Sequence, residues 1–383
     1  MLSAAPRTLR LGRHAAVLLT LTGLVLAVGP GSPSAAQLAG SSCAGWSSDH
    51  VPGTPSGPNI LHGVALTSAR NAWAVSYYLA GSYWTSRILH WNGRSWRSQA
   101  TPVPHSTELY GVAAVSASAA WAVGDYYDAA AGHYKTVILH WNGHSWSRQK
   151  SPNPPGADGH LRGVAAVSAR SAWAVGSSYA SPHVTSGRTL ILHWNGHAWS
   201  RQASPNVSTG TNALSAVTAT SRWNAWAVGQ YDTSAAHPLI LRWNGRTWSR
   251  QRSPNPVGSD TLHAVTATSR SNAWAVGQDY GAETLVLRWN GRSWFRQVSP
   301  NARVPDDLNG VTATSASNMW AAGYYLYNGQ DRSMVIHWYR GAWYTPSRPT
   351  GIGNSTLYGI AATPANVWAV GQIGSQNLAL RRC

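Results

Sequence analysis

Acidic and aromatic side chains lie close together at several regularly spaced places in the sequence. A carboxylate that accepts hydrogen bonds from hydroxyl groups, next to a ring that offers an apolar plate, suits sugar recognition. We therefore predict a set of ligand-binding residues, the alternative being that these tyrosines cover strand edges with their hydroxyls in solvent. The residues are Asp125, Tyr126, Tyr179, Tyr231, Asp232, Asp279, Tyr280 and Tyr324.

Histidines and arginines occupy two other repeated positions. The histidines directly precede a tryptophan, and Arg242 and Arg288 replace them in two repeats. A metal ion needs ligands within about 2.0–2.1 Å, and equivalent positions of different repeats should be too far apart, so we predict structural or solvent-facing histidines and no metal site. Arginines two residues after another tryptophan are expected to pack on it as cation–π partners or to line a basic groove. The histidines are His90, His140, His193 and His337, and the arginines are Arg148, Arg201, Arg250 and Arg296.

Enzyme chemistry has little support in this sequence. The chain has 12 carboxylates, and their one obvious pair is Asp306 with Asp307. Neighbouring residues of an extended segment point apart, and Pro305 indicates a loop. No Gly-x-Ser-x-Gly turn, cysteine nucleophile or phosphate loop is present. We predict no catalytic residue and no cofactor, and we favour a binding protein over an enzyme.

All these positions belong to one sequence repeat. A motif of Ala, Val or Met followed by Trp-Ala recurs every 46 to 53 residues, and a leucine lies 11 or 12 residues before its Trp. An apolar run ending in Trp, a turn, and another Trp five residues later follow in six of the repeats, and the pattern places 19 of the 22 tryptophans. The leucines, which mark the repeat starts, are Leu61, Leu109, Leu161, Leu214, Leu262, Leu308 and Leu357.

One repeat is typical of four short strands. In the third repeat these are expected at 161–167, 172–176, 190–194 and 198–202. Asn195-Gly196 predicts a two-residue hairpin in which Trp194 pairs with His197 and both strand tryptophans share one face. Seven such meanders predict an all-β, seven-bladed propeller of four antiparallel strands per blade. Glycine or alanine in each first strand suits the crowded axis, and the tryptophans suit the widening outer wedges.

The two ends of the chain are expected to meet in the seventh blade. That repeat has three strands and stops at Cys383, whereas Cys43-Ala-Gly-Trp46 matches the start of a fourth strand. Residues 43–50 should therefore complete the blade. The two cysteines of the chain fall at the hairpin position, so we predict a disulfide between Cys43 and Cys383.

Residues 1–36 have the features of a secretory signal. Three arginines precede an apolar run at 15–28, and small residues at 34–36 suit cleavage before Gln37. We predict a secreted monomer in which residues 37–383 form a single propeller, with no membrane span. The net charge of +17, or +14 without the signal arginines, predicts anionic partners such as a cell-envelope polymer, or alternatively serves solubility. Because the charge is spread through the repeats, a specific nucleic-acid partner is disfavoured.

The Val-Trp-Ala-Val-Gly, apolar-Trp-Asn-Gly and x-Ser-Trp pattern resembles tryptophan-rich secreted propeller repeats of actinobacteria. It is also similar to tectonin repeats and to seven-bladed bacterial lectin propellers, and the resemblance covers residues 46–383. It implies recognition of cell-surface or cell-wall glycans. The longer, variable connections, from second to third strand and from fourth strand to the next blade, should share one face and carry that function. Two alternatives remain: a polysaccharide-active hydrolase or lyase with one axial site, and an extracellular protein-interaction scaffold.

Overall fold

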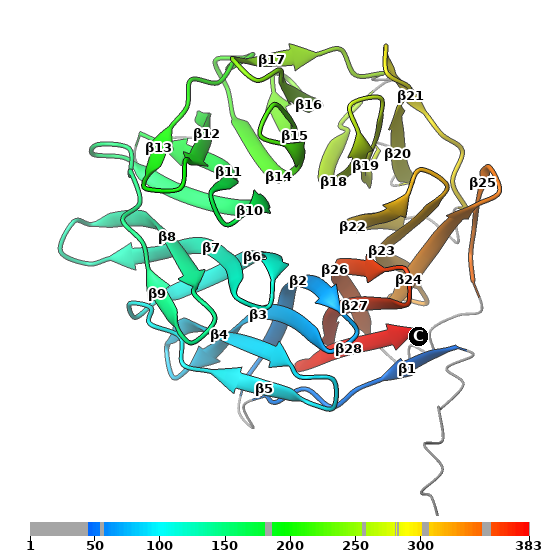
Figure 1. Cartoon of the computed structure of the whole chain (residues 1–383). Helices are drawn as coiled ribbons and strands as arrows, with labels where there is room; N and C mark the ends of the chain where they lie inside the picture. The colour runs from blue at the N-terminus through cyan, green and yellow to red at the C-terminus, as the bar shows by residue number, and fades with distance from the viewer. Residues whose placement is uncertain are drawn as a thin grey trace, which may run out of the picture. The chain divides into compact units, whose positions relative to one another are not determined.

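The structure is a computed structural model that describes residues 45–53, 57–180, 186–254, 258–279, 281, 283–300, 306–346 and 354–382. These residues form seven antiparallel sheets of four strands each, set around a central axis (Figure 1). The predicted fold class is confirmed. The described residues include no helix long and apolar enough to cross a membrane.

Each blade runs from its first strand at the axis to its fourth strand at the rim (Figure 1). Blades 1 to 4 comprise β2 (Asn59–Ser68), β3 (Asn71–Ala80), β4 (Tyr83–Trp91) and β5 (Trp96–Gln99); β6 (Thr107–Ser116), β7 (Ala119–Asp128), β8 (His133–Trp141) and β9 (Trp146–Arg148); β10 (Asp158–Ser168), β11 (Ser171–Tyr179), β12 (Gly187–Trp194) and β13 (Trp199–Arg201); β14 (Asn212–Ser221), β15 (Asn224–Asp232), β16 (Ala236–Trp243) and β17 (Trp248–Gln251). Blades 5 to 7 comprise β18 (Thr261–Ser269), β19 (Asn272–Gln278), β20 (Thr284–Trp289) and β21 (Trp294–Arg296); β22 (Asp306–Ser315), β23 (Asn318–Tyr327), β24 (Gln330–Tyr339) and β25 (Ala342–Tyr344); β26 (Ser355–Thr363), β27 (Asn366–Ile373), β28 (Gln376–Arg382) and β1 (Trp46–Ser48).

The predicted hairpin register at Asn-Gly is wrong. Trp194 lies opposite Trp199, so the connection has four residues and not two. The Asn195 side-chain oxygen accepts the backbone N–H groups of His197 and Ala198 at 3.0 Å each, which makes this an Asx-type turn in which the asparagine side chain takes part. The two tryptophans still share one face, because directly opposed residues of an antiparallel pair point the same way.

The tryptophans fill the wedges between blades. Trp173 of the third blade is fully buried and lies 5.0 Å from the Trp243 ring and 5.1 Å from the Trp248 ring of the fourth. The same three-ring arrangement joins the first blade to the second, where Trp73 meets Trp141 and Trp146. Edge and tilted contacts of this kind are favourable beyond the area they bury.

Small residues allow the first strands to approach one another. A Cβ added at Gly63 would lie 2.8 Å from the Tyr110 carbonyl oxygen of the next blade, and one at Gly359 would lie 2.8 Å from that of His62. Real Cβ atoms do not come so close to backbone. The prediction of glycine or alanine at the axis is therefore explained by backbone contact between neighbouring blades.

The N-terminal strand completes the last blade, as expected. β1 pairs antiparallel with β28, with Trp46 opposite Arg382 (Figure 1). The rings of Trp46 and Trp320 meet edge to face at 6.0 Å. Cys43 and Cys383, with their predicted disulfide, lie outside the described residues, as does the predicted signal at 1–36.

Candidate functional site

Each first strand carries a β-bulge in its first half, next to the axis. The pairing of first and second strands skips one residue in all seven blades, between the leucine and the small residue that follows two positions later. Such a bulge leaves the extra residue out of the ladder and redirects its side chain. The extra residues are His62, Tyr110, Arg162, Ser215, His263, Asn309 and Tyr358.

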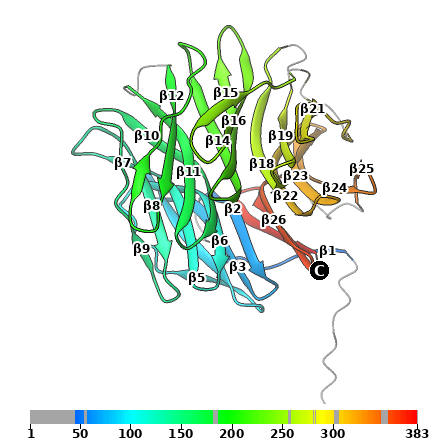
Figure 2. The same cartoon turned by 45° about the horizontal axis from the view of Figure 1, so that its top comes forward.

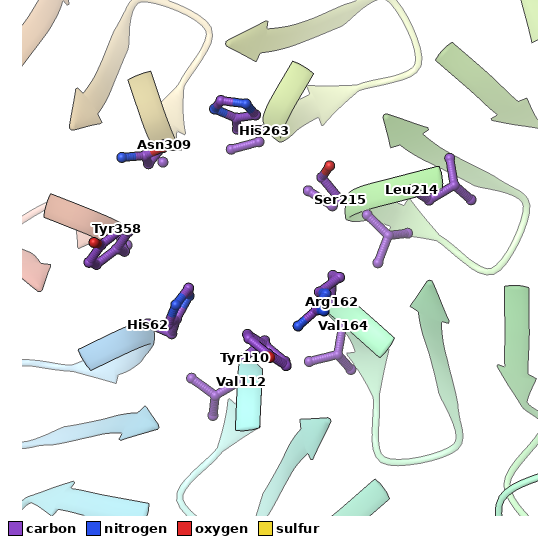
Figure 3. A pocket seen from close by; sticks show the side chains of 18 of the residues that line it. His62, Tyr110, Val112, Arg162, Val164, Leu214, Ser215, His263, Asn309 and Tyr358 are labelled. Carbon is purple, nitrogen blue, oxygen red and sulfur yellow. The ribbon is translucent and has the colours of Figure 1, made fainter. Parts of the chain in front are cut away.

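These seven side chains line a pocket on the axis with a volume of about 720 Å³. In Figure 3 they stand around a common opening, with His62, Tyr110 and Arg162 from successive blades on one side and His263 across from them. The residues lie in the first half of each innermost strand, near the end where the variable connections emerge (Figure 2). The pocket therefore belongs to the face on which function was predicted.

Arg162 supplies the permanent positive charge of the pocket. Its guanidinium carbon lies 3.7 Å from the centre of the Tyr110 ring, and its Nη1 lies 3.8 Å from Asp125 Oδ2. The same carboxylate oxygen lies 3.2 Å from His160 Nδ1. Stacking on one side and a carboxylate behind hold the arginine in place, and its nitrogen atoms point toward the open pocket in Figure 3.

A cluster of partly buried aromatic side chains lies beside Arg162. His62 stacks with Tyr358 at 4.9 Å and with Tyr77 at 5.2 Å, and its Nε2 lies 3.2 Å from the Tyr77 hydroxyl. Burial, aided by the charge of Arg162, lowers the pKa of His62 to about 3, whereas burial and the charge of Glu108 raise the pKa of Tyr77 to about 12. The imidazole and the phenol are therefore both neutral at pH 7.

Tyr110 and His263 complete the polar lining. The Tyr110 hydroxyl donates a hydrogen bond of 2.6 Å to Glu108 Oε2, and burial raises the pKa of this tyrosine above its ordinary range although Arg162 opposes the shift. His263 Nδ1 lies 3.1 Å from Asp307 Oδ1. Burial alone would lower the pKa of His263, but the hydrogen bond to Asp307 and the charge of its carboxylate raise it.

Among the residues that the structure describes, the pocket lining combines hydroxyl, amide, imidazole and guanidinium groups and includes no carboxylate. Glu108, Asp125 and Asp307 stand behind it and pair with Tyr110, Arg162 and His263. Such a surface can stack a flat or ring-shaped ligand on aromatic groups and bind an anionic group through arginine. Within the described part of the chain, no cluster of three or more histidine, cysteine or acidic residues is placed to hold a metal.

The structure brings some of the predicted ligand residues to this pocket. Asp125 is 3% exposed and pairs with Arg162 from behind, and Tyr179 is part of the lining. Tyr324 lies opposite Asp307 in the sixth blade; burial and the nearby Asp307 charge raise its pKa.

Others lie away from the axis and contact arginines of their own blade. The Arg148 guanidinium lies 4.6 Å from the Tyr126 ring, and Arg250 donates a 2.8 Å hydrogen bond to the Tyr231 hydroxyl. In the fifth blade Arg296 pairs with Asp279. Thus three of the four arginines at Trp-plus-two, Arg148, Arg250 and Arg296, pair with tyrosine or aspartate. Asp232 accepts a hydrogen bond from Gln230, and Tyr280 lies outside the described residues.

The repeated histidines have the predicted structural role. His90, His140 and His193 stack on the second-strand tryptophans directly opposite, at 4.3, 4.1 and 4.1 Å between ring centres. Arg242 takes the same position over Trp226 at 4.8 Å. This explains why histidine and arginine can replace each other at this register.

The axial residues were not predicted from the sequence, although the sequence contains a signal for them. In the motif leucine-x-small, x varies among His, Tyr, Arg, Ser and Asn while its neighbours stay nearly constant. In an ordinary strand such a residue would point away from its neighbours, and the bulge that turns it to the axis has no separate sequence mark. The signal was one variable position, x, in a motif whose other two positions are nearly constant.

No family model and no curated protein match this chain. Solved structures of similar fold include "YCF48 bound to D1 peptide" (TM-score 0.57, 17% identity, covering 88% of this chain and 94% of that one). A second is YCF48 from Cyanidioschyzon merolae (0.58, 15%, 88% and 99%). A third is the polysaccharide lyase PL25-ulvanlyase bound to -[GlcA(1-4)Rha3S]- (0.53, 11%, 80% and 89%). At these identities the similarity concerns the fold.

Proposed function

We propose that this chain is a binding propeller that takes a glycan with acidic sugar residues at its axial pocket. The observation that carries the proposal is the lining itself: Arg162 presents a guanidinium beside the rings of His62, Tyr110 and Tyr358, and no carboxylate faces the ligand. Sugar rings pack their C–H faces on aromatic plates, and an arginine fork matches a carboxylate or sulfate.

The axial pocket favours one ligand site per chain. Its seven bulge residues differ from blade to blade, so they form one composite surface and not seven copies of a small site. A lyase of similar fold is bound to a polymer that contains glucuronic acid, which agrees with the proposed ligand class. A multivalent lectin-like site at Tyr126 and Tyr231 is less well supported, because arginines already cover those rings.

Titration with short oligouronates, and with neutral oligosaccharides of equal length, tests this proposal. We expect binding of the acidic ligand only, and an affinity loss of at least tenfold in Arg162→Gln, since one charge-assisted bidentate contact contributes about 1.5–3 kcal/mol. Arg188→Gln is the matched control, because Arg188 is exposed and absent from the pocket lining. Equal loss in both variants, or preference for a peptide with a free carboxyl end, would contradict the proposal.

A polysaccharide lyase is the second candidate, and the two pocket histidines favour it. The pKa values of His62 and His263 move in opposite directions, as those of paired bases and acids do. In elimination a base takes the proton next to the sugar carboxylate, the bond to the leaving oxygen breaks, and an acid protonates that oxygen. His62 is neutral and has a nitrogen that can accept a proton, and the raised pKa of His263 makes it the better proton donor of the two. Ultraviolet absorbance of the unsaturated product detects this reaction. If several polyuronates give no product, the lyase function is excluded for them and only the binding function remains.

We also propose, from the sequence, that residues 1–36 direct export and that Cys43 and Cys383 form a disulfide once the chain is outside. N-terminal sequencing of protein from the culture medium should begin at Gln37. Mass spectrometry of the nonreduced protein should find no free thiol, and two free thiols would refute the pairing.

A further inference from the structure

Eight of the chain's 27 arginines, although far apart in the sequence, lie on one face of the propeller. We call it the turn face, formed by the connections from first to second and from third to fourth strand. In the described part of the chain these are residues 69–70, 117–118, 169–170, 222–223, 270–271, 316–317 and 364–365, and residues 92–95, 142–145, 195–198, 244–247, 290–293 and 340–341. The chain returns to this face twice in each blade. Because several of these turns contain one arginine each, the arginines together form a cationic surface. The arginines are Arg70, Arg94, Arg170, Arg222, Arg246, Arg270, Arg292 and Arg340, all exposed.

Acidic residues lie elsewhere. None of the chain's 12 acidic residues is in these turns. Eleven of them lie at the opposite ends of the blades, in or next to the variable connections, and Asp49 follows β1 and pairs with Arg381. Within the described residues no turn arginine forms an ion pair. The turn face therefore carries arginines without acidic residues, whereas both kinds of charge are present on the rest of the propeller.

The turn face is also level, and Trp223 exposes a large apolar group on it. All seven connections from first to second strand have two residues, and the two turns of a blade touch, as the approach of Arg70 to Gly93 shows. Trp223 is 53% exposed in the fourth blade, and the Arg222 guanidinium lies 4.4 Å from its ring. The equivalent residues in the other blades are Arg, Ser or Ala.

We propose that the turn face docks this protein flat on a lipid bilayer that contains anionic phospholipids. Arginines next to an anionic bilayer each contribute attraction that adds over the surface. An indole at the same level has the amphipathic character that places tryptophan at membrane interfaces. The axial pocket, near the other face, then points away from the bilayer and stays open to its ligand.

A planar partner fits better than a linear polyanion. The eight arginines are distributed over blades 1, 3, 4, 5 and 6, so a flat charged surface meets all of them at once, whereas one strand of polymer crosses few. Single-stranded nucleic acid is bound on successive aromatic rings, whereas the exposed Trp223 and Tyr339 at this face belong to blades 4 and 6, which are not neighbours.

Cosedimentation with vesicles tests the proposal, with neutral phosphatidylcholine vesicles compared with vesicles that contain phosphatidylserine or phosphatidylglycerol. Vesicle sedimentation is preferable to fluorescence because the chain has 22 tryptophans. The test variant is the triple change Arg94→Gln, Arg246→Gln and Arg292→Gln. The control triple Lys150→Gln, Arg188→Gln and Arg252→Gln removes the same charge from exposed positions outside the turn face.

We expect partition to the anionic vesicles alone, and a loss of roughly a hundredfold in the test triple, about fivefold for each arginine. The control triple should lose much less, and Trp223→Ser, which copies Ser118 and Ser271, should lose several-fold. Unchanged melting temperatures establish that the variants fold. Equal losses in both triples would show that binding depends on the net charge and not on the turn face, which would overturn the proposal. Tighter binding of soluble polyphosphate or single-stranded DNA, with no vesicle binding, would also overturn it.

Discussion

The Arg382 guanidinium lies 4.8 Å from the centre of the Trp320 ring, in the register position that a third-strand tryptophan holds in the other six blades. Val367 pairs with Arg382 as Ala72 pairs with Trp91. The blade that closes the ring thus replaces a ring–ring contact by a cation–π contact. Its fourth-strand partner, Trp46, comes from the other end of the chain.

We predict that Arg382→Ala lowers the free energy of unfolding by about 1 kcal/mol, the size of a partly exposed cation–π contact. Arg382→Trp, which copies the other blades, should keep or exceed wild-type stability. Urea denaturation measures both. Greater destabilisation by Trp than by Ala would mean that this wedge is too narrow for a third indole.

Trp173→Ala should cost about 3–5 kcal/mol, the range for removing a large buried aromatic side chain. Trp173 is fully buried between two blades, whereas Trp223 is 53% exposed, so Trp223→Ala should change stability by less than about 1 kcal/mol. Denaturant titration of the two variants checks the contrast. Equal effects would show that burial in the wedges does not determine the role of these residues.

The sequence was sufficient to predict the blades because each tryptophan recurs at a fixed place in a periodic unit. Trp173 marks a second strand, Trp199 a fourth strand, and Trp46 the missing strand of the last blade, and all three are confirmed. The register between Trp194 and Trp199 was wrong because the Asn195 side chain bonds two backbone N–H groups. The spacing of apolar residues does not show that an asparagine side chain takes the place of backbone hydrogen bonds in the turn.

The site was harder to predict because it depends on relations between blades. Arg162 and His62 are 100 residues apart in the sequence and line one pocket only when the first three blades pack around the axis. Asp125 was predicted as a ligand contact, and in the structure it holds Arg162 from behind. The arginines of the turn face also come together only in the folded ring, because the turns that carry them recur once or twice per blade on the same face.

Stability should fall as the pH decreases from about 6.5 toward about 3, in part because of His62. Its pKa is lowered to about 3 in the folded chain, so the unfolded state binds the proton first, and the stabilisation present above pH 6.5 is lost on acidification. The ring is partly accessible, which limits the effect to roughly 2 kcal/mol. The difference in pH profile between wild type and His62→Gln measures it. Parallel profiles would contradict the shift.

His263 should act in the opposite sense. Asp307 raises its pKa above the ordinary value, so the folded state keeps the proton to higher pH than the unfolded state. This stabilisation is complete below about pH 6.5 and disappears as the pH rises through the folded-state pKa. His263→Gln should therefore destabilise the protein more at pH 5.5 than at pH 8.5. NMR titration of the imidazole provides a direct measurement, and a pKa below 6.5 would refute the prediction.

A short acidic oligosaccharide should titrate with one site per chain. The axial lining is one composite surface, whereas Tyr126 and Tyr231 are covered by Arg148 and Arg250. Isothermal titration in solution avoids the avidity that an immobilised glycan would add. The double variant Tyr126→Phe, Tyr231→Phe keeps both rings and should bind as wild type does, while Tyr110→Ala should lose most of the affinity.

Several sites per chain, together with lost binding when Tyr126, Tyr179, Tyr231 and Tyr280 are all changed, would instead establish the multivalent arrangement. Added salt separates the two contributions, because contact with the aromatic rings should persist at an ionic strength that screens attraction to Arg162.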